Sequence, residues 1–310
     1  MKKKLTIIIP TYNVEQYIEK ALDSIYNQQN IDLEQDIQVL IIDDGSNDNT
    51  ALIINNWLSS KNTQSFQYIK KSNGNWGSVI NYVKNNKLIK GEYVSILDAD
   101  DFYNTNCFQE VFQISTLNQY DLIISNFKRI NEKGKTKPTK VIYSFKSKEI
   151  VKNKSFTPWS IPMCKFFKAD LFYQLNDLKE NVSYQDQILF FSLLIQAKKI
   201  YFIKNNLGFY FVSRPNSSSV VDWNKKRIEV WMENMNKLLS CNIPELSAYV
   251  NMMVNYCYIN TKDKENRKYI IIKKEYINIF KSSKFSFLPK GLDWIAKIWF
   301  SFAIRKIIKK

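Results

Sequence analysis

The sequence predicts an α/β fold, in which a mostly parallel, Rossmann-like sheet is flanked by helices on both faces. Short apolar runs rich in Ile and Val recur along the first hundred residues, and helical patterns separate them. Two of these runs end in clusters of aspartates, as expected where parallel strands bring their carboxyl ends to one ligand-binding edge. The composition, 45% hydrophobic and 15% aromatic, is sufficient for a large core.

The first half of the chain alternates between strand and helix patterns. Residues 5–9 are uniformly apolar and end at Pro10, which is typical of a buried strand followed by a turn. In residues 14–27 the apolar side chains recur at helical spacing. The same criteria predict further strands at 38–42, 66–69 and 93–97, and helices at 51–58 and 79–87.

The second half is predicted to complete the sheet and then to become helical. The patterns indicate strands at 122–125 and 201–203, a basic loop or hairpin at 128–140, a helix opening at 181–186 and a loop at 210–219. From Trp223 onward apolar residues recur at helical spacing. We therefore expect an α/β domain over residues 1–220 and a helical C-terminal region over residues 221–310.

Three carboxylates follow the strand predicted at 93–97, within four positions. In an extended chain Asp98 and Asp100 project to the same side, and two carboxylates held that close repel. A bound Mg²⁺ or Mn²⁺ relieves this repulsion, and such ions usually complete their coordination with water and substrate phosphates. The alternative is a solvated acidic turn without a ligand.

Asp43-Asp44-Gly45-Ser46 follows the strand at 38–42. By itself this stretch favours a turn, in which Ser46 or Asn47 caps the next helix. The functional alternative is that one aspartate accepts hydrogen bonds from a nucleotide base or ribose at the strand end.

Asp186 lies at the start of a predicted helix and has two interpretations. Ser183-x-x-Asp186 matches a capping pattern, in which the acidic residue binds the cap amide, and spacing alone favours this one. The alternative is a general base directed from the helix N-terminus into a cleft, where the helix dipole favours the charged carboxylate.

Composition excludes several classes of site. The chain has no histidine, so a Ser-His or Cys-His catalytic pair is impossible and a zinc site is not expected. The general base must therefore be Asp, Glu, Lys, Tyr or Cys. The four cysteines form no C-x-x-C motif and fit a reducing cytosol. The N-terminal apolar run is too short for a signal peptide, so we expect a cytoplasmic protein.

Four motifs in succession resemble the nucleotide-binding half of the family-two glycosyltransferases, which have the GT-A fold. They are a strand with P-T-Y-N at 5–13, a strand with D-D-G-S at 39–46, N-G-N-W-G-S-V-I-N at 73–81 and G-E-Y-V-S-I-L-D-A-D-D at 91–101. The resemblance covers about residues 4–220. It implies donor-binding positions at Pro10, Tyr12, Asp44, Asn73, Asp98 and Arg214.

The resemblance also implies roles for these residues. Tyr12 and Asp44 would hold the uracil of a UDP-sugar, and Asp98 would lie at the ribose. Asp100 would bind the Mn²⁺ or Mg²⁺ that bridges the donor diphosphate. Asp186 matches the family's base, although Gln185 stands before it where the family usually has Glu. Arg214, with the serines at 217–219, would belong to a loop that closes over the donor.

The expected function is therefore a metal-dependent inverting transfer of a sugar from a UDP-sugar to a glycan, lipid-linked or protein-linked acceptor. A sugar-phosphate nucleotidyltransferase is one alternative, but residues 10–13 are not the Gly-rich phosphate loop it would normally show. A nucleic-acid-binding protein is another, since the net charge is +16. No nucleic-acid-binding motif is present, however, and the predicted cleft is acidic, so no nucleic-acid partner is expected.

Much of the positive charge lies near the C-terminus. Residues 262–310 carry 14 Lys or Arg and 4 Asp or Glu. Residues 292–308 form an apolar stripe with two tryptophans on a helical pattern, broken by four charges. One interpretation is a helix that packs on the catalytic domain. The other is a helix over residues 289–310 that lies on an anionic membrane surface, at the inner face of the plasma membrane.

Overall fold

The computed structural model divides the chain into two compact units, residues 1–151 with 159–222 and residues 152–158 with 223–310. The residues that the structure describes are 2–115, 119–139, 148–150, 162–212, 228, 229, 231 and 233. The last four are helical, in agreement with the pattern expected from Trp223. The boundary expected after residue 220, Arg214 and the segment 289–310 lie outside the described residues.

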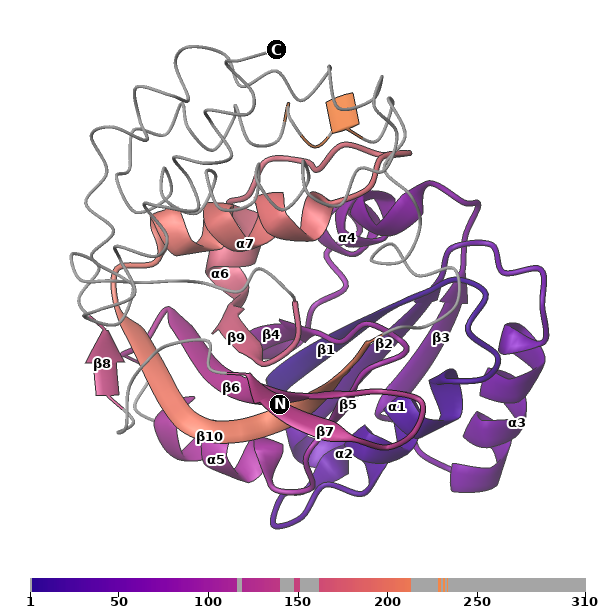
Figure 1. Ribbon diagram of the computed structural model, residues 1–310, viewed down its shortest axis with the longest axis horizontal. Helices are drawn as coiled ribbons and strands as arrows, with labels where there is room; N and C mark the ends of the chain where they lie inside the picture. The colour runs from indigo at the N-terminus through magenta and orange to yellow at the C-terminus, as the bar shows by residue number, and fades with distance from the viewer. Residues whose placement is uncertain are drawn as a thin grey trace, which may run out of the picture. The chain divides into compact units, whose positions relative to one another are not determined.

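The first unit is built on one mixed sheet flanked by helices (Figure 1). Its strands are β1 (Lys3–Thr11), β2 (Ile37–Asp43), β3 (Phe66–Lys70), β4 (Gly91–Ile96), β5 (Phe102–Tyr103), β6 (Leu122–Ile130), β7 (Thr136–Thr139), β8 (Lys148–Ile150), β9 (Lys165–Lys168) and β10 (Ile200–Phe211). Their order is β3-β2-β1-β4-β9-β6-β10-β5, with β7 on β6 and β8 on β10.

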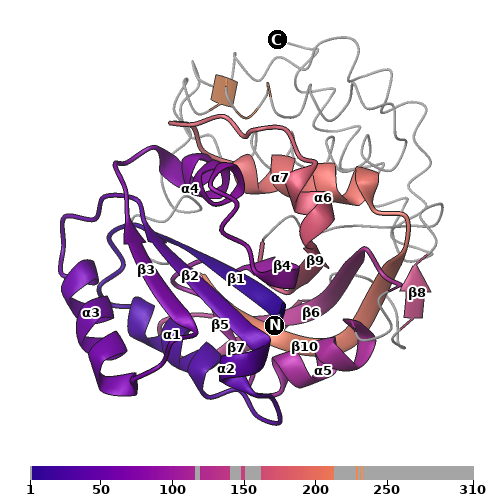
Figure 2. The same cartoon turned by 180° about the vertical axis from the view of Figure 1, so that it is seen from behind.

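Helices cover both faces of this sheet. They are α1 (Ile18–Tyr26), α2 (Leu33–Asp36), α3 (Thr50–Lys61), α4 (Asn75–Asn85), α5 (Cys107–Ser115), α6 (Ala169–Tyr173) and α7 (Gln185–Gln196). Helices α4, α6 and α7 lie on one face, and α1, α3 and α5 lie on the other (Figures 1 and 2). The expected α/β architecture is confirmed.

The central strands are buried because both of their faces are covered. Ile7, Ile8 and Ile9 of β1 are fully buried, and every residue of β2 is buried. Strands β1, β2, β3 and β4 pair in parallel, and burial on both faces explains the continuous apolar runs in the central strands β1 and β2. Their carboxyl ends therefore meet at one edge of the sheet.

The second half of the sheet differs from the expected pattern. Strand β9 lies between β4 and β6 and is antiparallel to both. The polar segment after residue 128 is the β6–β7 hairpin. Strand β10 continues to Phe211, so Tyr210 lies on a strand and not in the loop expected from residue 210. The expected short strand at 201–203 is the start of this longer strand.

Two helix starts also differ from expectation. Helix α1 begins at Ile18 and not at residue 14, because the carbonyl of Val14 accepts hydrogen bonds from the N–H groups of Tyr17 and Ile18 in a turn. Helix α4 begins at Asn75, so Trp76 lies in its first turn. In the part of the chain that the structure describes, no helix is both long and apolar enough to cross a membrane.

Candidate active site

The carboxyl ends of β1, β2 and β4 place three of the predicted site segments next to one another. The Asp44 N–H donates to the carbonyl of Thr11 at 2.8 Å, and the Leu97 N–H donates to the carbonyl of Ile8 at 2.9 Å. Pro10 pairs with Ile42 of β2. The Tyr12 side chain is 45% exposed, as a ligand-facing ring at the strand end would be.

Asp43 has a structural role in the turn after β2. Its fully buried carboxylate accepts hydrogen bonds from the Ser46 N–H at 2.7 Å and from the Tyr68 hydroxyl at 2.6 Å. Gly45 has φ +81°, which glycine adopts without strain. The expected capping by Ser46 or Asn47 is wrong, because α3 begins at Thr50 and its N-cap is Asn49.

Asp44 is directed into the loop that precedes α4. Its carboxylate, 3% exposed, accepts hydrogen bonds from Lys71 Nζ at 2.7 Å and from the Gly74 N–H at 3.0 Å. Ser78 Oγ lies 3.4 Å from the same carboxylate oxygen. Asn73 Nδ2 donates to the Asp44 carbonyl at 2.9 Å. Asp44 and Asn73 are therefore brought together, with Lys71 as a cationic neighbour.

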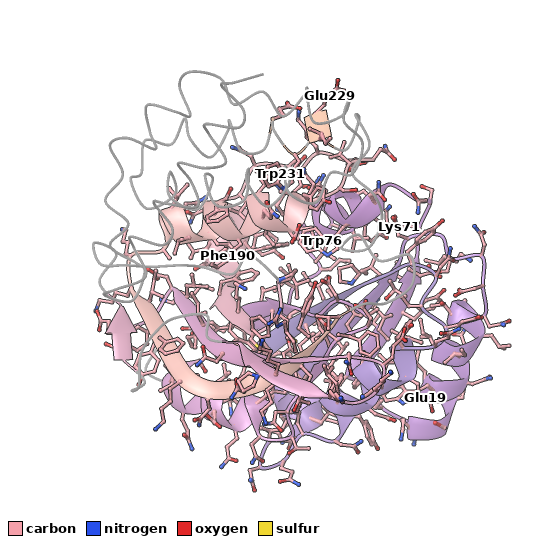
Figure 3. The ribbon with its side chains drawn as sticks, in the orientation of Figure 1. Glu19, Lys71, Trp76, Phe190, Glu229 and Trp231 are labelled. Carbon is pink, nitrogen blue, oxygen red and sulfur yellow. The ribbon has the colours of Figure 1, made fainter. Side chains whose placement is uncertain are left out.

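Trp76 connects this loop to the acidic turn. Trp76 is labelled in Figure 3. Its Nε1–H donates to Asp98 Oδ1 at 3.0 Å, so it orients a carboxylate rather than filling the core. Gly77 beside it lacks room for a side chain, since a Cβ there would lie 2.5 Å from the carbonyl oxygen of Lys179. The close approach of α4 to the loop before α7 requires glycine at this position.

The acidic stretch after β4 is a turn and not an extended segment. The Asp101 N–H donates to the Asp98 carbonyl at 2.9 Å, so the expected alternation of Asp98 and Asp100 is wrong. The buried Asp101 carboxylate accepts a hydrogen bond from the Phe211 N–H at 2.8 Å and so ties this turn to the end of β10.

Four carboxylates lie near the hydroxyl of Tyr210 on β10. Burial and this negative charge raise the pKa of Tyr210 well above its usual value. The carboxylates concerned are Asp101, Asp98, Asp100 and Asp186. The predicted base is therefore brought close to the acidic turn, from a helix more than eighty residues later in the chain.

Asp186 is the second residue of α7 and does not belong to a capping box. The N-cap is Tyr184, in the left-handed region with φ +64°, and no side chain caps the helix. The interpretation as a cap with Ser183 is therefore wrong. Burial raises the pKa of Asp186 to about 6, although the backbone N–H groups of Gln187 and Asp186 and the charge of Lys165 act in the opposite direction. A carboxylate of this pKa is ionised at neutral pH and more basic than usual.

Gln185, the residue that departs from the resemblance, is buried beside the base. Its Oε1 accepts a hydrogen bond from the Lys179 N–H at 2.9 Å. An uncharged amide at this position holds the preceding loop without adding a further negative charge to the acidic cluster.

Sequence reasoning missed Lys165, at the start of β9. The side chain is 3% exposed, and Nζ lies 4.6 Å from the centre of the Phe190 ring. Burial lowers the pKa of Lys165 to about 7, whereas the charges of Cys164, Asp186 and Asp98 raise it. A single charged residue within the apolar stretch 162–167 was the available signal.

The residues around the acidic turn fit a divalent cation that is shared with a substrate. Among the residues that the structure describes, no three His, Cys, Asp or Glu side chains are grouped to hold a metal by protein ligands alone. Mg²⁺ is typically held by one or two carboxylates together with water and substrate phosphates. Asp100, partly exposed in the turn, is suited to that arrangement.

The chain is similar in sequence to several glycosyltransferases. The model of glycosyl transferase family 2 matches residues 6–176, more than half of the chain. "Uncharacterized glycosyltransferase MG060" of Mycoplasma genitalium is 42% identical over 79% of this chain and 81% of its own length. "Uncharacterized glycosyltransferase MG025" of the same organism is 35% identical over 99% of this chain and 98% of its own length.

Two more distant relatives have more specific names. A poly(ribitol-phosphate) beta-N-acetylglucosaminyltransferase, TarP of Staphylococcus aureus, is 28% identical over 70% of this chain and 65% of its own length. The crystal structure of S. aureus TarS residues 1–349 in complex with UDP-GlcNAc superposes with a TM-score of 0.66, at 18% identity, over 89% of this chain and 79% of that chain. The fold is thus that of the GT-A glycosyltransferases, and the chain belongs to glycosyl transferase family 2.

Proposed function

We propose that this glycosyltransferase moves a sugar from a UDP-sugar to an acceptor hydroxyl, with a divalent cation and with inversion at the anomeric carbon. One observation supports this most strongly. A carboxylate whose pKa is raised to about 6, Asp186, lies near the same tyrosine hydroxyl as the acidic turn 98–101. A single displacement at a sugar diphosphate requires a base for the acceptor hydroxyl. It also requires, close to that base, carboxylates that can bind a cation at the phosphates.

In the proposed reaction the acceptor hydroxyl attacks the anomeric carbon from the face opposite the nucleotide. The new bond joins the acceptor oxygen to this carbon, while the bond from the carbon to the phosphate oxygen breaks. Asp186 takes the hydroxyl proton as the attack proceeds. A divalent cation bound at Asp100 would offset the negative charge of the leaving diphosphate. A single displacement converts an α-linked donor into a β-glycoside.

The surroundings of Asp44 favour uracil as the donor base. The uracil N3–H is a donor, and the Asp44 carboxylate is the acceptor that complements it. Lys71 Nζ lies 2.7 Å from this carboxylate and also donates to the Ser72 carbonyl and to Ser78 Oγ, so it orients Asp44. Cytosine has an acceptor at N3 and a donor at N4. Cytosine would therefore place its N3 acceptor against the Asp44 carboxylate, which is also an acceptor.

We expect UDP to bind at least about fivefold more tightly than CDP, since an unsatisfied buried polar group costs about 1–3 kcal/mol. Lys71→Met should reduce this preference, because it removes the cation that orients the Asp44 carboxylate. Lys70→Met is the matched control, since Lys70 Nζ donates to the Ser46 carbonyl and not to Asp44. Titration calorimetry with both nucleotides measures the effect. Equal affinity for UDP and CDP in the wild type would contradict the assignment of the base.

The acceptor is proposed to be a hydroxyl of a glycan, lipid-linked or protein-linked molecule of the cell envelope. The relative named for poly(ribitol-phosphate) supports an envelope polymer. The structure solved with UDP-GlcNAc supports a UDP-sugar donor. The basic segment 289–310 would hold the enzyme at an anionic membrane surface, where a lipid-linked acceptor is found.

The proposed function is tested by incubating the protein with UDP-glucose, UDP-galactose and UDP-N-acetylglucosamine, with and without Mn²⁺. We expect slow release of UDP from one of these donors only when Mn²⁺ is present, because water replaces the missing acceptor. No turnover of any donor, together with salt-dependent retention on DNA, would instead favour the nucleic-acid-binding alternative.

A further inference from the structure

Lys165 is a charged residue in an interior position, where lysine is rarely found unless it is paired. Its side chain is 3% exposed. Taking an ammonium group out of water is costly, and the lost hydration must be replaced by nearby negative charge or polarisable groups. The neighbours of Lys165 therefore indicate what the charge does.

The neighbours come from three separate elements. Phe190 on α7, labelled in Figure 3, is one of them. It lies under the ammonium group, with Nζ 4.6 Å from its ring centre. Phe190 is four residues after Asp186, and residues at this spacing share one face of a helix. The ammonium thus meets the face of α7 that carries Asp186. The charges of Asp186 and Asp98 both act on Lys165, and Asp98 belongs to the turn after β4.

The backbone that carries Lys165 is fixed on both sides. Strand β9 pairs with β4 and with β6, where Lys165 stands opposite Ile124. Ser95 Oγ donates to the Lys165 carbonyl at 2.8 Å. The preceding residue, Cys164, is in the left-handed region with φ +60°, and its carbonyl accepts a hydrogen bond from the Ser125 N–H at 3.0 Å.

A left-handed conformation is unfavourable for a non-glycine residue and persists only where the surroundings enforce it. Here it sets the direction in which Lys165 leaves the strand. The backbone of Lys165 is therefore fixed by a rigid part of the sheet, and not by a flexible loop.

We propose that Lys165 is a positioning residue of the transfer reaction: its ammonium group, seated on Phe190 at the Asp186 face of α7, favours the ionised form of Asp186 that acts as the base. This inference rests on the proposed function, in which Asp186 accepts the acceptor proton. A positive charge on this face of the helix stabilises a carboxylate nearby. Lys165 acts through Asp186 and has no proton-transfer step of its own.

Other charged groups also surround Asp186. Asp98, Asp100 and Asp101 of the acidic turn lie near the Tyr210 hydroxyl of β10, as Asp186 does. The backbone N–H groups of Gln187 and Asp186 and the charge of Lys165 favour the ionised carboxylate of Asp186, against the effect of burial. Burial lowers the pKa of Lys165 to about 7, so its charge is present in the pH range where Asp186, with a pKa of about 6, gains or loses its proton.

The test compares Lys165→Met and Lys165→Arg with the wild type. Methionine has a similar length and suits a buried position, so the fold should be kept, while the charge is lost. For release of UDP from the donor that the wild type uses, with Mn²⁺, we expect Lys165→Met to lower kcat by about 10-fold to 100-fold. The KM for the donor and the Kd for UDP should stay within about twofold to threefold, because the effect is on the base.

The pH profile distinguishes positioning from a merely structural role. We expect the acidic limb of kcat to move to higher pH by about one unit in Lys165→Met, and to stay near its wild-type position in Lys165→Arg, which keeps the charge. Lys61→Met is the matched control. Lys61 also lies over aromatic rings and beside a carboxylate, Asp23, but on α3, so its loss should leave the limb unchanged.

A second measurement does not depend on turnover. Carboxyl-carbon NMR of ¹³C-labelled aspartate, with the Asp186 signal assigned by its loss in Asp186→Asn, gives the pKa of Asp186 directly. We expect a higher pKa of Asp186 in Lys165→Met than in the wild type. An unchanged pKa overturns the inference about Lys165, whether or not the protein is active. If the pKa moves as expected but the wild type releases UDP from no donor, the proposed function fails instead.

Discussion

Asp186→Asn is expected to lower kcat for sugar transfer by ~10²-fold or more, the usual scale for loss of a general base, while UDP binds with unchanged affinity. Asparagine nearly preserves the shape of the side chain but cannot accept the acceptor proton. Asparagine Oδ1 can still accept hydrogen bonds from the N–H groups of Gln187 and Asp186 in the first turn of α7, as the carboxylate does. Single-turnover transfer and UDP calorimetry on the same preparation measure the two effects separately.

The pKa of Asp186 also gives the sign of the accompanying change in stability. Burial raises this pKa from 3.8 to about 6. The folded state therefore binds the proton more tightly than the unfolded state, so the free energy of unfolding falls as the pH rises from 3.8 to about 6 and stays at the lower value above that. An uncharged asparagine avoids this cost, so the variant should melt at the same temperature as the wild type or higher at pH 7. For the same reason wild-type kcat should fall as the pH drops below about 6.

Asp177→Asn is the control for this substitution. Asp177 lies in the segment before α7, is exposed and pairs with Lys84. It should keep wild-type transfer. Transfer at the wild-type rate in Asp186→Asn would show that another group removes the proton.

Asp100→Ala is expected to abolish the metal-dependent stabilisation of the protein by UDP. In the wild type, UDP at 100 times its Kd should add about 2.7 kcal/mol to the free energy of unfolding, and only when Mg²⁺ or Mn²⁺ is present. The cation joins the protein to the diphosphate, so loss of its carboxylate ligand removes the joint contribution. Thermal unfolding with and without metal measures the effect.

Asp170→Ala serves as the control for the metal experiment, since Asp170 is an exposed aspartate in the first turn of α6. Its response to UDP and metal should equal that of the wild type. UDP stabilisation of the same size in Asp100→Ala, with or without metal, would mean that Asp100 does not bind the cation.

The first half of the fold was predictable because a local sequence pattern indicates each of its helices and strands. Apolar runs that end in Pro10, Asp44 and Asp98 identify buried parallel strands and their ligand-binding edge. Strand β9 could not be predicted in this way. It has four residues, and its place between β4 and β6 depends on pairing with segments about seventy and forty residues earlier in the chain.

The candidate site was likewise predictable only in part. Asp44, Asp98, Asp100 and Asp186 were identified from motifs. Their partners Lys71, Trp76 and Lys165 were not, because a hydrogen bond or ion pair between distant residues leaves no periodic signal. The interpretation of Asp186 as part of a cap was wrong because the S-x-x-D pattern does not determine the residue at which the helix begins. The helix begins at Gln185, so Asp186 is not the acidic partner of a Ser183 cap.

The antiparallel insertion of β9 also has a consequence for how the protein is made. As the chain is synthesised, β1, β2, β3 and β4 are complete by residue 96, yet β4 obtains its second neighbour only when residue 168 has been added. Until then β4 has one unpaired edge, although it is a central strand in the folded protein. Such an edge can pair with other chains. Nascent chains that end between β4 and β9 should therefore be the most dependent on chaperones, and the candidate active site can form only after synthesis passes α7.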